Sequence, residues 1–227
     1  MDWPLASCRN SSERRRVNAD QKADAVVILL SGGVESSTLL YEFSGGSAPI
    51  GVFIDYGQRA ARRELAAVHA QCRAAGAHLQ RLDMVAAGRS FRAGQILSRH
   101  VPLPHRNLMI LSVGLNYCAQ VQAGSLAIGL GREDATADPG SAPRFIREFQ
   151  RLARILGDVA VVAPFMAKTK AWIIRHGLEL GVGYAQTYSC LLGYPRHCGR
   201  CPQCRKRRAA FAAAGAPEPP DFYRAGD

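Results

Sequence analysis

The chain has 227 residues, 48% of them hydrophobic and 21% charged, which is typical of a globular protein with a sizeable buried core. Its net charge of +11 favours anionic partners, although a basic surface alone does not separate a nucleotide from a nucleic acid. No apolar run approaches the roughly 20 residues of a membrane-spanning helix, and residues 1–22 lack a hydrophobic signal core. We therefore expect a cytoplasmic protein without a membrane partner, which begins with a flexible basic arm over residues 1–22.

From residue 25 onward, short apolar runs alternate with amphipathic helical patterns. Strands covered on both faces are predicted at 25–30, 50–55, 125–130 and 159–165. Helices are predicted at 36–43, 62–77, 106–124, 143–156 and 168–180. This alternation predicts an α/β, Rossmann-like doubly wound parallel sheet over residues 23–183. Ligands bind such sheets at the carboxyl ends of the strands, so the loops there are the expected site.

The loop after the first predicted strand has the composition of an anion-binding turn. Gly32 and Gly33 permit a close backbone approach, and a helix expected to begin near Ser36 directs free N–H groups at the loop. Ser31, Ser36 and Ser37 add hydroxyl donors. We interpret the segment as a phosphate-binding loop rather than an incidental strand–turn–helix. It matches neither G-x-x-x-x-G-K-[ST] nor G-x-G-x-x-G, so neither γ-phosphoryl transfer nor dinucleotide binding is indicated.

The residues SGGVES at 31–36 resemble the SGGxDS signature of the PP-loop ATP pyrophosphatases. The resemblance implies an adenine nucleotide alpha hydrolase-like fold that uses ATP and Mg²⁺ and transfers AMP to an acid or a carbonyl oxygen, with release of pyrophosphate. The implied nucleotide-binding residues are Ser31, Gly32, Gly33, Val34, Glu35, Ser36 and Ser37. Glu35 stands where the family has aspartate, and its extra methylene is expected to shift the magnesium or phosphate geometry.

The region after residue 183 loses the strand–helix rhythm and contains four clustered cysteines. Cys190, Cys198, Cys201 and Cys204 have the two close spacings of a tetrahedral zinc site. Four protein ligands close such a site, so we predict one structural Zn²⁺ per chain. His197 is a poor substitute ligand because it adjoins Cys198. Residues 184–227 are therefore predicted to form a small zinc knuckle, a basic helix and a proline-rich tail.

Basic residues crowd around this predicted knuckle. They are Arg196, Arg200, Arg205, Lys206, Arg207 and Arg208. We interpret them as compensation for the thiolate charge and attraction for ATP. RNA binding is less favoured, because few aromatic residues lie nearby to stack bases.

Four further segments resemble the 7-cyano-7-deazaguanine synthases of queuosine precursor biosynthesis, in the same order along residues 25–215. They are FIDYGQR at 53–59 with Glu64, HRNLMILSVG at 105–114, PFMAKTKAWII at 164–174 and SCLLGYPRHCGRCPQCRKRRAAF at 189–211. Two positions depart from the family pattern, because Ala60 replaces a histidine and His105 replaces a glycine.

The resemblance and the residue chemistry together indicate further site residues. The predicted catalytic residues are Lys170, Arg106 and Asp55, and the predicted substrate-binding residues are Asp134, Asn107 and Gln58. Lys170 and Arg106 are expected to stabilise charge on the phosphate during AMP transfer. Asp55, at the end of the second strand, is expected to accept hydrogen bonds from a ribose or to hold a metal.

The resemblance weakens over residues 129–146. The family segment GVNxxDYSGYPDCRPEFI corresponds to GLGREDATADPGSAPRFI, which keeps Asp134 and the helix start at 143–146. The tyrosines and the arginine of the family are absent from residues 135–142, which removes stacking surface and a cation. The nucleotide half of the site is therefore better preserved than the acceptor half.

The favoured function is an ATP-dependent ligase. It would adenylate a carboxylate and convert it with ammonia to an amide and then a nitrile, with 7-carboxy-7-deazaguanine or a related deazapurine acid as substrate. Two alternatives remain open. One is a PP-loop adenylase that acts on a different or macromolecular acid, on a protein or a tRNA. The other is a non-catalytic nucleotide- or RNA-binding protein. A homodimer is left as an option.

Overall fold

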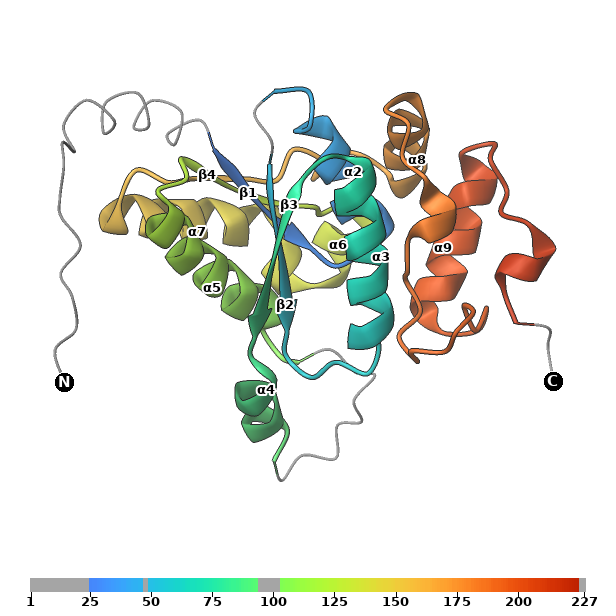
Figure 1. Ribbon diagram of the computed structural model, residues 1–227, viewed down its shortest axis with the longest axis horizontal. Coiled ribbons are helices and arrows are strands. Elements are labelled where there is room, and N and C mark those ends of the chain that lie inside the picture. The colour runs from blue at the N-terminus through green and yellow to red at the C-terminus, as the bar shows by residue number, and fades with distance from the viewer. Residues whose placement is uncertain (1–24, 47–48, 94–102, 225–227) are drawn as a thin grey trace, which may run out of the picture.

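The computed structural model describes residues 25–46, 49–93 and 103–224. The predicted arm, residues 1–22, lies outside the described residues. Five strands form one parallel sheet in the order β3-β2-β1-β4-β5 (Figure 1). They are β1 (Val26–Leu30), β2 (Ile50–Asp55), β3 (His78–Asp83), β4 (Ser125–Ile128) and β5 (Ala160–Val162). The predicted doubly wound α/β sheet is confirmed.

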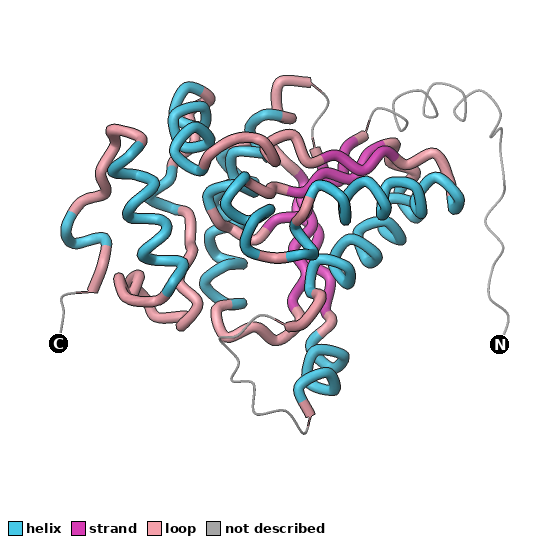
Figure 2. Tube along the Cα trace, turned by 180° about the vertical axis from the view of Figure 1, so that it is seen from behind, coloured by secondary structure: helices cyan, strands magenta, loops and turns pink. Residues whose placement is uncertain are grey.

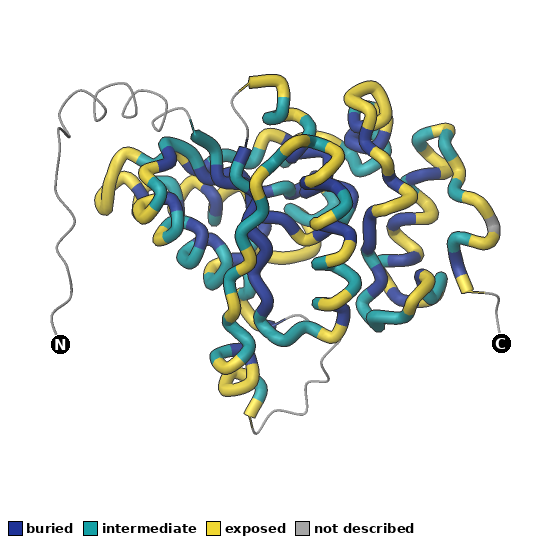
Figure 3. Tube along the Cα trace, viewed as in Figure 1, coloured by how far each residue is buried: buried dark blue, intermediate teal, exposed yellow. Residues whose placement is uncertain are grey.

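The central strand β1 divides the core into two layers. Ile28 and Leu30 pack on one face of the sheet, and Val27 and Leu29 pack on the other. Helices α2 (Val34–Glu42), α3 (Ala61–Ala74) and α8 (Lys170–Glu179) cover the first face, and α5 (Arg106–Val121) and α7 (Pro143–Leu156) cover the second. Each such buried aliphatic side chain contributes roughly 1.5–3 kcal/mol. Figures 2 and 3 show helices on both sides of the strands and buried residues concentrated between them.

One strand and two α-helices of the described residues were not predicted. The edge strand β3 reads HLQRLD and pairs only with β2, so most of its side chains are exposed or half-buried and it lacks an apolar run. The short helices α4 (Val85–Arg92) and α6 (Arg132–Ala137) follow β3 and β4. The strand predicted at 159–165 is shorter than expected, and the structure has β5 over Ala160–Val162 only.

The strands are all parallel, but the order in which the chain adds them to the sheet changes direction at β1. From β1 the chain moves outward to β2 and β3, and it then returns to the other side of β1 as β4 and β5. The carboxyl ends of β1 and β4 therefore diverge into loops on opposite faces, and this switch point is where open α/β sheets bind ligands. None of the helices in the described part of the chain has both the length and the apolar character needed to span a membrane.

The region after α8 packs against the same side of the sheet as α2 and α3. It contains the turns η2 (Tyr184–Gln186) and η3 (Pro220–Phe222), with a cysteine-bearing loop and α9 (Pro202–Ala213) between them. Figure 1 shows α9 next to α8 at one end of the molecule, and Phe211 of α9 belongs to the core cluster on the sheet face that α2, α3 and α8 cover.

Arg207 of α9 fastens this region internally. Its side chain is 1% exposed and lies 2.8 Å from the Glu218 carboxylate, which is itself buried. It also donates to Thr187 Oγ1 at 2.8 Å and to the Tyr184 carbonyl oxygen at 3.0 Å. Arg207 therefore differs from the other basic residues near the predicted knuckle that were interpreted as compensation for the thiolates, because its charge is paired with Glu218.

Replacing Arg207 by methionine is expected to lower the free energy of unfolding by about 3–5 kcal/mol, because the substitution leaves the buried Glu218 carboxylate without its cation. Urea unfolding measures this change. The matched control is Arg205→Met on the exposed side of the same helix, which is expected to change stability by less than about 0.5 kcal/mol. Equal losses in the two variants would contradict the assignment.

Candidate active site

The loop after β1 is shaped for close backbone contact. Gly32 has φ +72°, and a Cβ there would lie 2.7 Å from the Glu64 carbonyl oxygen, so only glycine fits. Gly33 is the N-cap of α2, which begins at Val34 rather than near Ser36, and no side chain caps its first turn. The first N–H groups of α2 therefore remain free to bind an anion.

The loop serines are linked to one another. Ser31 Oγ lies 3.1 Å from Ser36 Oγ, and the Ser31 N–H donates to Ser36 Oγ at 3.2 Å. The Gly33 N–H donates to Ser31 Oγ at 3.3 Å. Ser37 is 1% exposed, and Val34 is equally buried, so Val34 offers the site its backbone only. Ser31 and Ser36 thus form the hydroxyl lining of the loop.

Lys170 stands opposite this loop at the first residue of α8. Its Nζ lies 2.7 Å from Glu35 Oε1, and the two side chains are 11% and 13% exposed. Burial acts to lower the pKa of Lys170, but the carboxylates of Glu35, Asp134 and Glu133 outweigh it and raise the pKa above its usual value. Lys170 therefore remains a cation.

Two carboxylates, Glu35 and Asp134, act electrostatically on this lysine and on each other. Asp134 lies in the first turn of α6 and accepts the Gly131 N–H at 3.1 Å. Burial and then the neighbouring Glu35 carboxylate raise the pKa of Asp134, while Lys170 opposes the rise. This mutual repulsion is the environment in which a divalent cation with oxygen ligands is stabilised.

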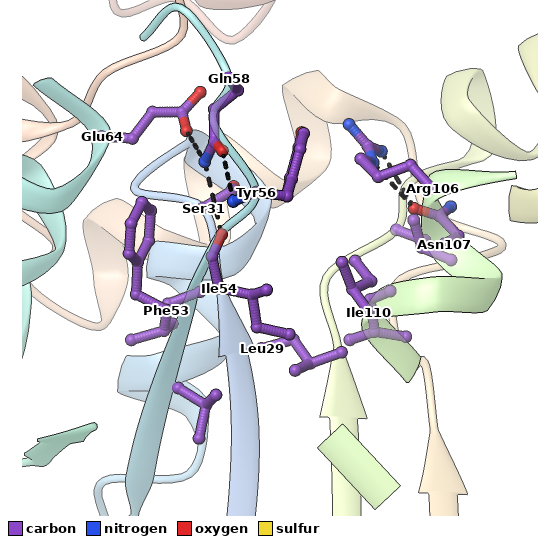
Figure 4. Close-up of a pocket in the computed structure, with 14 residues that line it drawn as sticks. Leu29, Ser31, Phe53, Ile54, Tyr56, Gln58, Glu64, Arg106, Asn107 and Ile110 are labelled. Carbon is purple, nitrogen blue, oxygen red and sulfur yellow. Dashed lines mark hydrogen bonds between the residues drawn. The ribbon is translucent and has the colours of Figure 1, made fainter. Parts of the chain in front are cut away.

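Two cavities meet at the carboxyl ends of the strands. The smaller, about 140 Å³, is mainly apolar and lies among β1, β2, β4 and α5; Figure 4 shows it. The larger, about 460 Å³, lies between the loop after β1, α6, α8 and the cysteine-bearing region. The larger volume falls within the roughly 300–1,000 Å³ of small-molecule sites.

Arg106 and Asn107 begin α5, where Arg106 lines both cavities and Asn107 lines the smaller one. Arg106 donates to Asn107 Oδ1 through Nε and Nη2, at 3.2 and 3.0 Å. Asn107 donates in turn to Ser141 Oγ at 2.8 Å, and Ser141 donates to Asp138 at 3.1 Å. This chain of hydrogen bonds holds Arg106 against the altered 135–142 segment.

His105, at the N-cap of α5, has left-handed backbone angles of φ 52° and ψ 28°. Such a conformation costs a non-glycine residue roughly 1–2 kcal/mol, which accounts for the family's glycine at this position. His105→Gly is therefore expected to raise the free energy of unfolding by about 1 kcal/mol in urea titrations. Ala75→Gly, at a helix end with φ −86°, is the control and should give no gain. A gain at Ala75 as large as that at His105 would refute the explanation.

Gln58 and Glu64 line the opposite wall of the smaller cavity. Gln58 Nε2 donates to Glu64 Oε2 at 2.9 Å, and Gln58 Oε1 accepts the Tyr56 N–H at 3.0 Å. Burial raises the pKa of Glu64 to about 7, against the lowering effects of Gln58 and Arg106. The sequence motif contains Glu64, but it indicated no role for that residue.

Asp55 is not brought to either cavity. Its Oδ2 accepts from Arg81 of β3 at 2.8 Å, and its Oδ1 accepts the Gly57 N–H at 3.0 Å. Neither set of cavity-lining residues includes Asp55. The structure therefore places Asp55 as a support for the β2–α3 loop, outside the cavity linings that contain Lys170 and Arg106.

The four predicted metal ligands come together. The Sγ atoms of Cys190, Cys198, Cys201 and Cys204 all lie within 4.8 Å of one another, which can hold a metal ion. The 3.8 Å between Cys198 Sγ and Cys204 Sγ matches the edge of a tetrahedron with Zn–S bonds of about 2.3 Å. His197 is excluded from the set, because its Nε2 accepts the Ser189 N–H at 2.9 Å.

The sheet order, the glycine–serine loop and the cavities define an α/β protein of the PP-loop class. A solved structure of NMN synthetase from Francisella tularensis shares this fold, with a TM-score of 0.53 at 14% identity over 92% of this chain and 84% of that one. The family model of the queuosine biosynthesis protein QueC matches residues 25–215, and the chain belongs to that family of enzymes.

Curated relatives agree with the family assignment. The 7-cyano-7-deazaguanine synthase 1 of Sulfurisphaera tokodaii is 32% identical, over 86% of this chain and 96% of its own length. The 7-cyano-7-deazaguanine synthase of Marinobacter nauticus is also 32% identical, over 88% and 98%. The expected resemblance is therefore confirmed, and the chain is an enzyme of the queuosine pathway.

Proposed function

We propose that the enzyme is an ATP-dependent ligase that converts 7-carboxy-7-deazaguanine, or a closely related deazapurine acid, into the nitrile. The observation that carries this proposal is that the smaller, apolar cavity adjoins the larger cavity at the glycine–serine loop. We call the larger cavity the polar cleft. Ser31 borders both spaces, whereas Glu35, Asp134 and Lys170 border the polar cleft alone. The proposal is further supported because Ser31 with Glu35, Arg106, Asp134 and Lys170 come from four separate segments of the chain and line these spaces.

The two spaces suit the two halves of ATP. The smaller cavity offers the apolar walls that an adenine ring needs, through Val52, Ile54 and Ile110. The free N–H groups of α2 and the hydroxyls of Ser31 and Ser36 suit the part of ATP that leaves as pyrophosphate. This arrangement would place the α-phosphorus where the two cavities meet, beside Arg106.

The residues present also fit the proposed metals. Glu35 and Asp134 provide hard oxygen ligands whose repulsion Mg²⁺ would relieve, and such a cation neutralises phosphate charge. The cysteine cluster provides a closed tetrahedral set for Zn²⁺, which supports a structural role. We propose one zinc per chain.

The chemistry follows from this placement. A carboxylate oxygen of the acid attacks the α-phosphorus of ATP, and pyrophosphate leaves from the glycine–serine loop. Ammonia then displaces AMP from the acyl carbon and gives the amide. A second ATP activates the amide oxygen in the same way, and loss of AMP and a proton gives the nitrile. Lys170 and Arg106 stabilise charge on the transferred phosphate.

A second candidate function rests on the altered acceptor segment. Residues 135–142 contain no aromatic side chain, and Ala137 and Asp138 line the larger cavity where the family has a small residue and a tyrosine. A differently shaped or larger acid is the alternative substrate, including an acid carried by a protein or a tRNA.

Mass spectrometry of reactions with ATP, Mg²⁺, ammonium and 7-carboxy-7-deazaguanine tests the proposal. We expect acid-dependent release of pyrophosphate and AMP, together with amide and nitrile products. Pyrophosphate release with other acids but not with 7-carboxy-7-deazaguanine would favour the second candidate. The absence of pyrophosphate release with any acid would contradict both.

A further inference from the structure

Four residues line both cavities. These are Ser31, Glu64, Arg106 and Leu130. Only Glu64 and Arg106 of this set are acidic or basic, and Figure 4 shows them on opposite sides of the smaller cavity. A ligand that extends from one cavity into the other must therefore pass between a carboxyl group and a guanidinium group.

Glu64 is held firmly at this junction. It lies in the first turn of α3, and its carbonyl oxygen packs so closely on Gly32 that a Cβ there would approach to 2.7 Å. Its Oε2 accepts from Gln58, which is fixed in turn by the backbone of β2 through the Ile54 carbonyl oxygen at 3.4 Å. The position of the carboxyl group is thus coupled to that of the phosphate-binding loop.

Glu64 differs from Glu35 and Asp55 in the charge of its side-chain partner. Glu35 pairs with the Lys170 cation at 2.7 Å, and Asp55 pairs with Arg81 at 2.8 Å. The hydrogen-bond partner of the Glu64 carboxyl is the neutral amide of Gln58. Its pKa of about 7, which is raised by burial, lets it exchange a proton near neutral pH.

We propose that Glu64 is the general base of the amide-forming step, an assignment that rests on the proposed function. Ammonia forms a C–N bond to the acyl carbon, and the C–O bond to AMP breaks. The proton released from nitrogen passes to the Glu64 carboxylate and then to solvent, while AMP leaves with its phosphate beside Arg106. The C–N bond formed, the C–O bond broken and the proton released therefore account for all atoms and charges, and no additional reagent is needed.

The variant Glu64→Gln separates this role from a structural one. Glutamine has the same size and its amide oxygen still accepts from Gln58, but it cannot accept the proton. Acid-dependent exchange of labelled pyrophosphate into ATP reports adenylation alone. We expect the variant to keep this exchange within about threefold of wild type, and to lose amide formation by about 10²-fold or more.

The pH dependence provides a second readout. A base must be deprotonated to act, so wild-type amide formation at constant free ammonia should rise with pH through about 7 and then level off. Glu64→Gln should lack this rise, and Glu64→Asp should recover part of the rate. The control is Glu148→Gln on the exposed face of α7, which should match wild type.

Three outcomes would overturn the assignment. Amide formation by Glu64→Gln at the wild-type rate would show that no base is needed there. Equal loss of exchange and amide formation would place Glu64 in adenylation instead. The absence of acid-dependent exchange in the wild type, with 7-carboxy-7-deazaguanine as the acid, would overturn the proposed function itself and the role of Glu64 with it.

Discussion

Replacing Lys170 by methionine is expected to lower acid-dependent pyrophosphate release by about 10²–10³-fold, the usual effect of removing a donor that stabilises transition-state charge. Methionine keeps much of the length and apolar contact of the side chain but removes the ammonium group that faces the glycine–serine loop. The rate of pyrophosphate release with saturating ATP and acid measures the effect.

This substitution also has an expected effect on stability. Lys170 and Glu35 are both nearly buried, so removal of the cation leaves Glu35 and Asp134 repelling each other in the cleft. We expect a loss of about 3–5 kcal/mol in the free energy of unfolding. The double variant Lys170→Met with Glu35→Gln should regain most of that stability, because it removes the unpaired charge, but it should not regain activity.

Pyrophosphate release and the free energy of unfolding, measured together, distinguish the possible roles of Lys170. Recovery of activity together with stability in the double variant would show that Lys170 acts only by neutralising Glu35. Full activity of the single variant would remove Lys170 from the catalytic mechanism. A loss of activity in the double variant that exceeds the loss in Glu35→Gln alone, after stability is restored, supports direct stabilisation of the phosphate charge by Lys170.

The strands could be predicted where burial on both faces alone requires apolar residues. Strands β1, β2 and β4 are covered on both faces, so their residues are almost uniformly apolar and are recognised without tertiary information. Strand β3 is an edge strand whose side chains are partly solvent-exposed, and its pairing of His78 with Ile50 and of Asp83 with Asp55 depends on β2. Local pattern could not reveal that dependence.

Because strand β3 was not predicted, the placement of the Asp55 side chain could not be predicted either. Its position at the end of a buried strand made it a reasonable candidate, but its partner Arg81 lies on the strand that was not predicted. The pairing of Lys170 with Glu35 is likewise a contact between distant segments that no spacing encodes. The cysteine cluster was predictable, because three of its four ligands lie within one turn-and-helix segment, Cys198–Cys204.

The cysteine cluster is expected to control the active site as well as its own region. The Tyr188 N–H donates to the Gly32 carbonyl oxygen at 2.7 Å, and Tyr188 and Ser189 line the larger cavity two residues and one residue before Cys190. Tyr188 also packs with Cys190, Cys201 and Cys204 in one buried cluster. A metal held by these thiolates would therefore fix the backbone that contacts the phosphate-binding loop.

Cys204→Ser should consequently remove zinc and weaken ATP binding together. Structural Zn²⁺ has apparent binding free energies of about 10–16 kcal/mol, so its loss should leave residues 184–224 sensitive to proteolysis while the parallel sheet keeps its circular dichroism signal. Metal analysis, limited proteolysis and ATP titration measure the three effects. Cys118→Ser, a buried core cysteine outside the cluster, is the control and should retain zinc. ATP binding at wild-type strength by zinc-free Cys204→Ser would show that the metal region does not shape the loop.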